Sequence, residues 1–283
     1  MNRLRFQPQQ IALCLALVGY ASLCPGHISG SGKTEANQVW PAQTWRTSPP
    51  HEQGISSALL AQMLEHIVDR ELLIDSVHVV RNGYVVLDAY QYPFTKDYLH
   101  IIHSCTKSIM STLIGLAIDD GLIVGVDERL ADVFAEYQPS SKLEIEHLLT
   151  MTTGLDSRDS YLYRWEGLSE MRRSEDWVEF ALSRSEAASP GSRFDYSNMA
   201  SFLLSALLQR KTGRTAEEYA QQRLFGPIGI EEVQWPKNPQ GINIGWGELR
   251  MHPLDLARIG LLYLRDGEWN GEQIEGVHAQ LPP

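Results

Sequence analysis

The sequence SCTKSIMSTLIGLAI, residues 104–118, begins with a serine and a lysine three positions apart and continues as a regular apolar pattern. Apolar side chains recur at the spacing of one helical face, at Ile109, Met110, Leu113, Ile114, Ala117 and Ile118. Residues i and i+3 of a helix are neighbours, about 5–6 Å apart at Cβ, so the Lys107 amine is expected to reach the Ser104 hydroxyl. A serine hydroxyl becomes a nucleophile when a nearby base takes its proton, and the first turn of a helix favours a developing oxyanion. The stretch therefore predicts a nucleophile–base pair, although a short S-x-x-K motif also occurs at ordinary helix starts.

A second polar group lies at Tyr196-Ser197-Asn198, in a turn before another apolar helical run, residues 199–208. A tyrosine beside a lysine ammonium has its ionised form favoured, which makes Tyr196 a candidate general base. The Asn198 amide is suited to donate to a substrate carbonyl and to accept a hydrogen bond from Lys107. We therefore expect Tyr196 to be catalytic and Asn198 to bind substrate.

These two motifs resemble those of a known enzyme group. The S-x-x-K motif followed by a polar second box is typical of penicillin-binding proteins and class A β-lactamases. With Y-S-N as its second box, the chain resembles the class C branch of the serine β-lactamase and DD-peptidase superfamily, which includes esterases and 6-aminohexanoate-dimer hydrolases. The resemblance extends from about residue 55 to about residue 274 and includes residues 77–86, 147–155, 224–230 and 249–260.

The resemblance implies an α+β fold of the β-lactamase/transpeptidase type, in which an antiparallel sheet carries a helical lobe between its early and late strands. It also implies a serine hydrolase that forms an acyl-enzyme with an ester, amide or β-lactam, a small-molecule substrate, and no cofactor. In this reading Ser104 attacks, Lys107 and Tyr196 transfer protons, and Asn198 orients the substrate carbonyl.

The third box of that superfamily, K-T-G or H-x-G on a strand beside the nucleophile, has no clear counterpart. Lys211-Thr212-Gly213 has the right letters, but it falls at the end of a predicted helix, where glycine is common, and a capping box beginning at Thr215 follows it. No other K-[ST]-G or H-x-G occurs between residue 213 and residue 283. We therefore expect a truncated or frameshifted reading frame that lacks the late strands, with residues 275–283 as an unrelated tail. The alternative function is a non-catalytic remnant or a ligand-binding pseudoenzyme of the same family.

Composition narrows the possible partners. The 283 residues are 43% hydrophobic, enough for a sizeable core in one domain or two closely packed lobes. A formal net charge of −11 argues against a nucleic-acid partner or an anionic membrane surface. The chain contains neither H-E-x-x-H nor C-x-x-C, so its sequence gives no support for a zinc site.

The N-terminal segment has the pattern of a secretory signal. Arg3 and Arg5 precede an apolar stretch at residues 11–19, and small residues suited to cleavage follow at Gly19 and Ala21. We expect a signal peptide over residues 1–21 and a periplasmic or secreted protein, with an uncleaved anchor as the alternative. Residues 22–54 are predicted to be a linker, and residues 55–274 the incomplete hydrolase domain.

Local patterns predict the main elements of that domain. An amphipathic helix is expected over residues 56–71, and two strands over residues 76–80 and 84–89, joined by the hairpin turn Asn82-Gly83. Helices are expected to dominate from residue 104, ending with a helix over residues 253–265 and a turn over residues 268–274. Only the two early strands are expected in the sheet, a pair that is marginal by itself in water.

Overall fold

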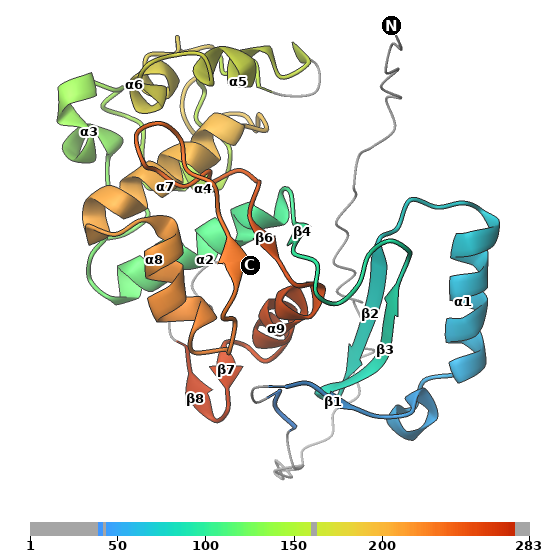
Figure 1. Cartoon of the computed structure of the whole chain (residues 1–283). Helices are drawn as coiled ribbons and strands as arrows, with labels where there is room; N and C mark the ends of the chain where they lie inside the picture. Colours follow the sequence, from blue (N-terminus) through green and yellow to red (C-terminus); the bar gives the residue numbers. More distant parts are fainter. Residues whose placement is uncertain (1–38, 42–43, 160–162, 275–283) are drawn as a thin grey trace, which may run out of the picture.

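The structure, a computed structural model, describes residues 39–41, 44–159 and 163–274 (Figure 1). The predicted signal peptide, most of the predicted linker and the predicted tail lie outside these residues. Near the end of the linker segment, β1 (Arg46–Thr47) and a short 3-10 helix, η1 (Pro50–Gln53), are regular structure.

The predicted hairpin is confirmed. Strands β2 (Ser76–Arg81) and β3 (Tyr84–Tyr90) pair antiparallel, with His78 opposite Asp88. Asn82 and Gly83 both have positive φ, of 52° and 82°, as a two-residue hairpin turn requires. Gly83 is also needed for space, because a Cβ at this position would lie 1.9 Å from the Val39 carbonyl oxygen.

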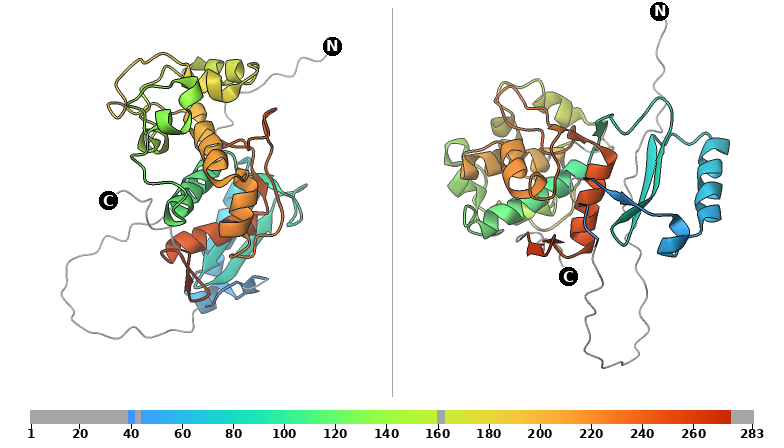
Figure 2. Two further views of the ribbon diagram at one scale, coloured as in Figure 1. Left: turned by 90° about the vertical axis from the view of Figure 1, so that its left-hand side faces the viewer. Right: turned by 60° about the horizontal axis from the view of Figure 1, so that its bottom comes forward.

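The prediction of a two-stranded sheet was wrong. Among the described residues the sheet has three strands in the order β1-β3-β2, because β1 pairs in parallel with the start of β3. A two-residue strand is too short to show an alternating pattern, so it leaves no trace in the sequence. The sheet lies between α1 (Ser57–Asp69) on one side and α9 (Pro253–Leu264) on the other (Figures 1 and 2).

Helix α1 begins where the sequence predicts, since the Ser56 side chain accepts a hydrogen bond from the Leu59 N–H and so caps the first turn. None of its residues is buried, and the apolar side chains of Leu59 and Val68 are 65% and 70% exposed. Its amphipathic pattern is therefore real, but the described part of the chain leaves much of its apolar face open.

The helical lobe is built on two long helices, α2 (Cys105–Asp119) and α7 (Asn198–Thr212), which contact each other along buried faces. Nearly the whole inner surface of both helices belongs to one apolar core. Shorter helices surround this pair: α3 (Leu130–Val133), α4 (Ile145–Leu149), α5 (Glu166–Met171), α6 (Trp177–Leu182), α8 (Ala216–Ala220), the 3-10 turn η2 (Ala135–Tyr137) and the π-helical turn η4 (Gln221–Phe225).

A second small sheet joins the lobe to the start of α2. Its strands are β4 (His100–Ile101), β6 (Arg250–Met251) and β5 (Val233–Gln234), in the order β4-β6-β5. The Ile102 N–H continues the pairing by donating to the Leu249 carbonyl at 2.9 Å. The loop before β6 is thereby held beside the first residues of α2.

One prediction at the end of the described chain is refined, and the prediction for the K-T-G letters is confirmed. Residues 268–274 form a small hairpin, β7 (Glu268–Trp269) and β8 (Glu272–Gln273), rather than a simple turn. The K-T-G letters end α7, as predicted: Gly213 is its left-handed C-cap, with φ 69°. The Lys211 amine forms an ion pair with Glu128 at 2.5 Å instead of facing Ser104.

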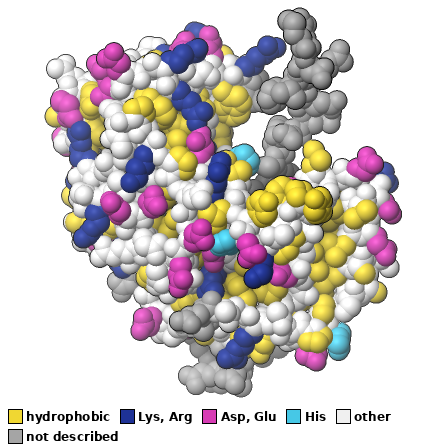
Figure 3. Space-filling view, in the orientation of Figure 1, with side chains coloured by type: hydrophobic (Ala, Val, Ile, Leu, Met, Phe, Trp, Pro, Cys, Tyr) yellow, Lys and Arg dark blue, Asp and Glu magenta, His cyan; other side chains and the backbone are white. Residues whose placement is uncertain are grey.

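The surface carries charges of both signs without a basic patch on the face shown, where lysine and arginine side chains are interspersed with acidic ones (Figure 3). Within the described ranges, no helix combines the length and the apolar character needed to cross a bilayer.

Candidate active site

Ser104 lies at the junction of strand β4 and helix α2. His103, the residue before it, has a left-handed backbone with φ 45°, which turns the chain sharply from strand to helix. The Thr106 hydroxyl donates to the His103 carbonyl at 2.7 Å and so fixes this turn. Ser104 is consequently presented at the first turn of a helix that is otherwise anchored in the core.

Lys107 is placed as the three-residue spacing predicts. Its amine donates to the Ser104 hydroxyl oxygen at 3.3 Å and to the Asn198 side-chain oxygen at 2.8 Å. A third hydrogen bond, at 2.7 Å, goes to the backbone carbonyl of Trp246, which sequence reasoning missed. A carbonyl oxygen belongs to every residue, so no side-chain pattern could have indicated this contact.

Tyr196 completes the cluster. Its hydroxyl lies 2.8 Å from the Ser104 hydroxyl, and the Lys107 amine lies 4.9 Å from the centre of its ring. The structure therefore brings together all the predicted site residues, from the start of α2 and from the turn that leads into α7. The Ser104 oxygen is within hydrogen-bond distance of both an amine and a phenol.

The Y-S-N turn is held by a neighbouring loop, residues 151–155. The Asp195 N–H donates to the Met151 carbonyl and the Gly191 N–H donates to the Thr152 carbonyl, both at 2.8 Å. Ser197 caps α7 by accepting from the Ala200 N–H at 3.1 Å. Backbone pairing on one side and a helix cap on the other thus fix the direction of the Tyr196 and Asn198 side chains.

Asp159 lies under this turn and was not predicted. Its carboxylate accepts hydrogen bonds from the Met199 N–H at 2.7 Å and from the Ser197 hydroxyl at 3.3 Å. Its backbone carbonyl accepts from the Asn198 amide at 3.3 Å. The side chain has no solvent exposure, and in the sequence it follows a polar stretch that gives no sign of such burial.

Electrostatics distinguish the two candidate proton acceptors. Burial lowers the pKa of Lys107 to about 7, although the Asp159 carboxylate acts in the opposite direction. Burial raises the pKa of Tyr196, the hydrogen bond from Ser104 acts against this, and the charge of Asp159 adds to it. The expectation that the Lys107 ammonium favours a tyrosinate is therefore not met, because loss of solvent and a nearby carboxylate both oppose the phenolate. Lys107 is the group that can accept a proton near neutral pH.

The loop that carries Trp246 also forms an edge of the site. The indole of Trp246 packs against Trp177 and Phe202, with ring centroids 5.9 and 6.1 Å apart. Arg172 lies over the same indole, 5.5 Å from the ring centre, and forms an ion pair with Glu248. These contacts hold the Trp246 carbonyl against Lys107.

No part of the described chain gathers three or more histidine, cysteine or acidic side chains in a way that could hold a metal ion. The cluster's chemistry is that of hydroxyl, amine and amide groups.

Comparison with known proteins identifies the family of the chain. The family model for β-lactamases matches residues 57–267, well over half of the chain. The chain belongs to the β-lactamase family. It is 24% identical, over 243 residues, to a 6-aminohexanoate-dimer hydrolase from Paenarthrobacter ureafaciens, an alignment that covers 80% of this chain and 61% of the relative.

Solved structures share the fold. A protein from Bacillus anthracis assigned as a 6-aminohexanoate-dimer hydrolase superposes with a TM-score of 0.67 at 22% identity, covering 77% of this chain and 60% of the other. A penicillin-binding protein homologue from Pyrococcus abyssi, described as octameric, superposes with a TM-score of 0.58 at 21% identity, covering 77% and 58%. The chain thus spans about three fifths of the length of these relatives, and its β-lactamase/transpeptidase-like α+β fold is shown.

Proposed function

We propose that this protein is a serine hydrolase that works through an acyl-enzyme. Lys107, as the neutral amine, takes the Ser104 proton directly or through the Tyr196 hydroxyl, while the Ser104 oxygen attacks the substrate carbonyl carbon. The tetrahedral intermediate collapses when the leaving group departs with a proton returned by this relay. Water, deprotonated by the same relay, then cleaves the Ser104 ester and regenerates the hydroxyl.

The observation that carries this proposal is the contact of one hydroxyl with two proton-transfer groups. The Ser104 oxygen lies 2.8 Å from the Tyr196 hydroxyl and 3.3 Å from an amine whose pKa is about 7. A base whose pKa lies near the working pH is present in its neutral form in a substantial fraction of molecules and is still basic enough to accept the serine proton. The Asn198 side chain is held by the Lys107 amine and by the Asp159 carbonyl, which supports the proposal that its amide binds substrate.

The substrate class that the comparisons support is a small acyl compound. Two relatives carry the name 6-aminohexanoate-dimer hydrolase, which supports a linear amide; esters and β-lactams fit the same serine chemistry. We infer no cofactor, nucleic-acid partner or stable membrane partner for this reaction.

Active-site labelling tests the proposal. A fluorophosphonate probe should attach to Ser104 and to no other serine, as read by peptide mapping with mass spectrometry, and Ser104→Ala should abolish the label. Lys211→Ala is the matched control. Lys211 belongs to the K-T-G letters but forms an ion pair with Glu128 instead of facing Ser104, so labelling should persist in this variant. Label that persists in Ser104→Ala would refute the assignment.

A non-catalytic binding protein is the second candidate, and one observation favours it. The K-T-G letters cap a helix instead of forming a strand beside Ser104, so the described residues offer no third-box N–H for the oxyanion. Losing one oxyanion donor costs about 10²–10³ in rate, so the presence or absence of such a donor would distinguish the two candidates. Saturable binding of a p-nitrophenyl ester without hydrolysis or labelling would support this candidate over the first.

We also infer a periplasmic or secreted location from the pattern of residues 1–21. Expression of the whole chain in a bacterium, followed by fractionation and N-terminal sequencing, tests it. A cytoplasmic protein that retains Met1 would contradict this inference.

A further inference from the structure

Asp159 is an unusual carboxylate for a protein interior. Among the described residues it is the only acidic side chain that is buried, at 0% exposure, and none of the ion pairs found there includes it. One of its oxygens accepts from Met199 and Ser197, while the other, Oδ1, is buried without a hydrogen-bond partner. A buried charge without a direct partner is costly, so such a group is expected to depend on a nearby opposite charge.

That opposite charge belongs to Lys107. The two side chains are joined through Asn198, whose oxygen accepts from the Lys107 amine at 2.8 Å and whose nitrogen donates to the Asp159 carbonyl at 3.3 Å. Each charge acts on the other: Asp159 favours the Lys107 ammonium, and Lys107 favours the Asp159 carboxylate, in both cases against the effect of burial. The two groups are therefore thermodynamically linked without touching.

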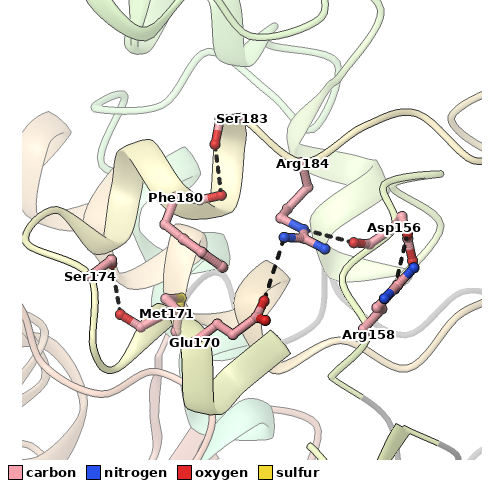
Figure 4. Close-up of polar contacts among 8 residues, drawn as sticks. All are labelled: Asp156, Arg158, Glu170, Met171, Ser174, Phe180, Ser183 and Arg184. Carbon is pink, nitrogen blue, oxygen red and sulfur yellow. Dashed lines mark hydrogen bonds and ion pairs between the residues drawn. The ribbon is translucent and has the colours of Figure 1, made fainter. Parts of the chain in front are cut away.

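The loop that carries Asp159 is held by contacts on two sides. The Arg184 guanidinium donates to the Asp156 carbonyl at 2.8 Å and lies 3.8 Å from Glu170, and Arg158 pairs with the Asp156 side chain at 3.3 Å (Figure 4). On the other side Gly167 packs against the loop backbone and donates its N–H to the Arg158 carbonyl at 3.0 Å. These contacts anchor residues 155–159 between α5 and α6.

We infer that Asp159 is a positioning residue of the active site, which aligns the Tyr196–Asn198 turn and stabilises the positive charge that forms on Lys107 when it takes the Ser104 proton. The inference rests on the proposed function. The carboxylate stands to the lysine as the aspartate of a catalytic triad stands to its histidine, in that it offsets the charge of the protonated base. Here the hydrogen bonds pass through Asn198 and the start of α7 instead of linking the two groups directly.

Other charged groups near the site are otherwise engaged. Tyr196 is the second titratable group facing Lys107, and burial keeps its phenol protonated by raising its pKa. Glu248 and Arg172, on the loop and helix at the site edge, form an ion pair with each other. Asp159 is thus the charge whose removal should act on Lys107.

The test is an NMR titration of the purified chain with lysine labelled at ¹³Cε, the Lys107 signal being assigned by its loss in Lys107→Arg. In the wild type the Lys107 midpoint is expected at about 7. In Asp159→Asn it should move to lower pH, because the ammonium loses a stabilising neighbour. Ser197→Ala is the matched control: it removes a hydrogen bond to the same carboxylate and a helix cap, so the melting temperature should fall while the Lys107 midpoint stays.

A reciprocal measurement covers the case in which Asp159→Asn does not fold. With aspartate labelled at ¹³Cγ, Lys107→Met should move the Asp159 midpoint to higher pH, because linked groups shift one another. An unchanged Asp159 midpoint in Lys107→Met, or a Lys107 midpoint in Asp159→Asn at or above the wild-type value, would overturn the inference. Neither titration depends on turnover, so failure of the proposed hydrolase function would be seen separately, as absence of Ser104 labelling.

Discussion

Lys107 changes its charge in the pH range in which a hydrolase works, because burial lowers its pKa to about 7. Only the neutral amine can accept the Ser104 proton. The rate of phosphonate labelling should therefore rise with pH through about 7 and level off above it. Rates measured between about pH 5 and about pH 9 check this sign, and a rate that falls over the same interval would exclude Lys107 as the base.

Tyr196 is expected to transfer protons rather than to act as a stable phenolate. Tyr196→Phe keeps the ring packed but removes the hydroxyl that lies 2.8 Å from Ser104, so acylation should fall by about 10²–10⁴-fold with little change in melting temperature. Tyr219→Phe is the comparison. Tyr219 lies on helix α8, and the variant removes a hydroxyl that donates to the Asp120 carboxylate at 2.7 Å. It should lower stability and spare acylation; equal rate losses in the two variants would point to a general packing effect.

The predictability of the site depended on the kind of group involved. Ser104 and Lys107 were recognisable because helical periodicity fixes the distance between positions i and i+3. The Trp246 carbonyl carries no side-chain signal, and Asp159 contributes through burial, which only the folded chain reveals. The pKa of Tyr196 was misjudged because a sequence shows a neighbouring charge but not the loss of solvent.

Gly167 on helix α5 packs against the backbone of the loop that contains Asp159. A Cβ on Gly167 would lie 1.8 Å from the Ser157 carbonyl oxygen, so Gly167→Ala must displace the loop that contains Asp159. We expect a loss of about 1–3 kcal/mol in the free energy of unfolding, measured by urea denaturation, together with slower Ser104 labelling.

Gly260 in α9 provides the matched glycine control. It lies inside a helix, and a methyl group added at its Cα would have open space around it, with nothing within 4 Å. Gly260→Ala should therefore stabilise the protein by about 0.5–1 kcal/mol and leave labelling unchanged. If both glycine variants behaved alike, the close approach at Gly167 would not be the cause.

Elements long enough to repeat their apolar pattern several times could be predicted from the sequence, and two-residue strands could not. The apolar spacing of α1, α2 and α9 and the turn at Asn82-Gly83 predicted bounds within one or two residues of those observed. Strands β1, β4, β5 and β6 have two residues each, which is too short for any alternation, so their pairing is decided by tertiary contacts.

The sheet and the helical lobe are joined by buried arginine contacts from α9. Arg258 donates to the Pro41 carbonyl at 3.1 Å and to the Ile228 carbonyl at 3.0 Å, and its guanidinium lies 5.6 Å from the centre of the Trp45 ring. Its partner on the same helix is Asp255, at 3.4 Å. One side chain thus connects the start of the described chain, the loop after η4 and the helix that covers the sheet.

Removing this connection should destabilise the whole molecule. Arg258→Met keeps much of the apolar stem but removes the cation beside Asp255, a half-buried carboxylate whose side chain is 16% exposed. Breaking a fully buried ion pair typically costs about 3–5 kcal/mol, so we expect a loss of stability up to this size. Arg129→Met is the control, because the Arg129 side chain is 54% exposed and its pair with Asp132 should contribute at most about 0.5 kcal/mol. Urea denaturation of the three proteins measures both effects.

The decrease in the free energy of unfolding caused by Arg258→Met should also depend on pH. Burial raises the pKa of Asp255, while Arg258 and His252 act against it, so the pKa rises further when Arg258 is removed. A carboxyl group whose folded pKa exceeds its unfolded value stabilises the fold at low pH, and this contribution is lost as pH rises through the folded pKa. The difference from the wild type should consequently be larger at about pH 8 than at about pH 5. A difference that is constant, or larger in acid, would show that Asp255 is not the group left uncompensated and that Arg258 acts through its carbonyl and ring contacts alone.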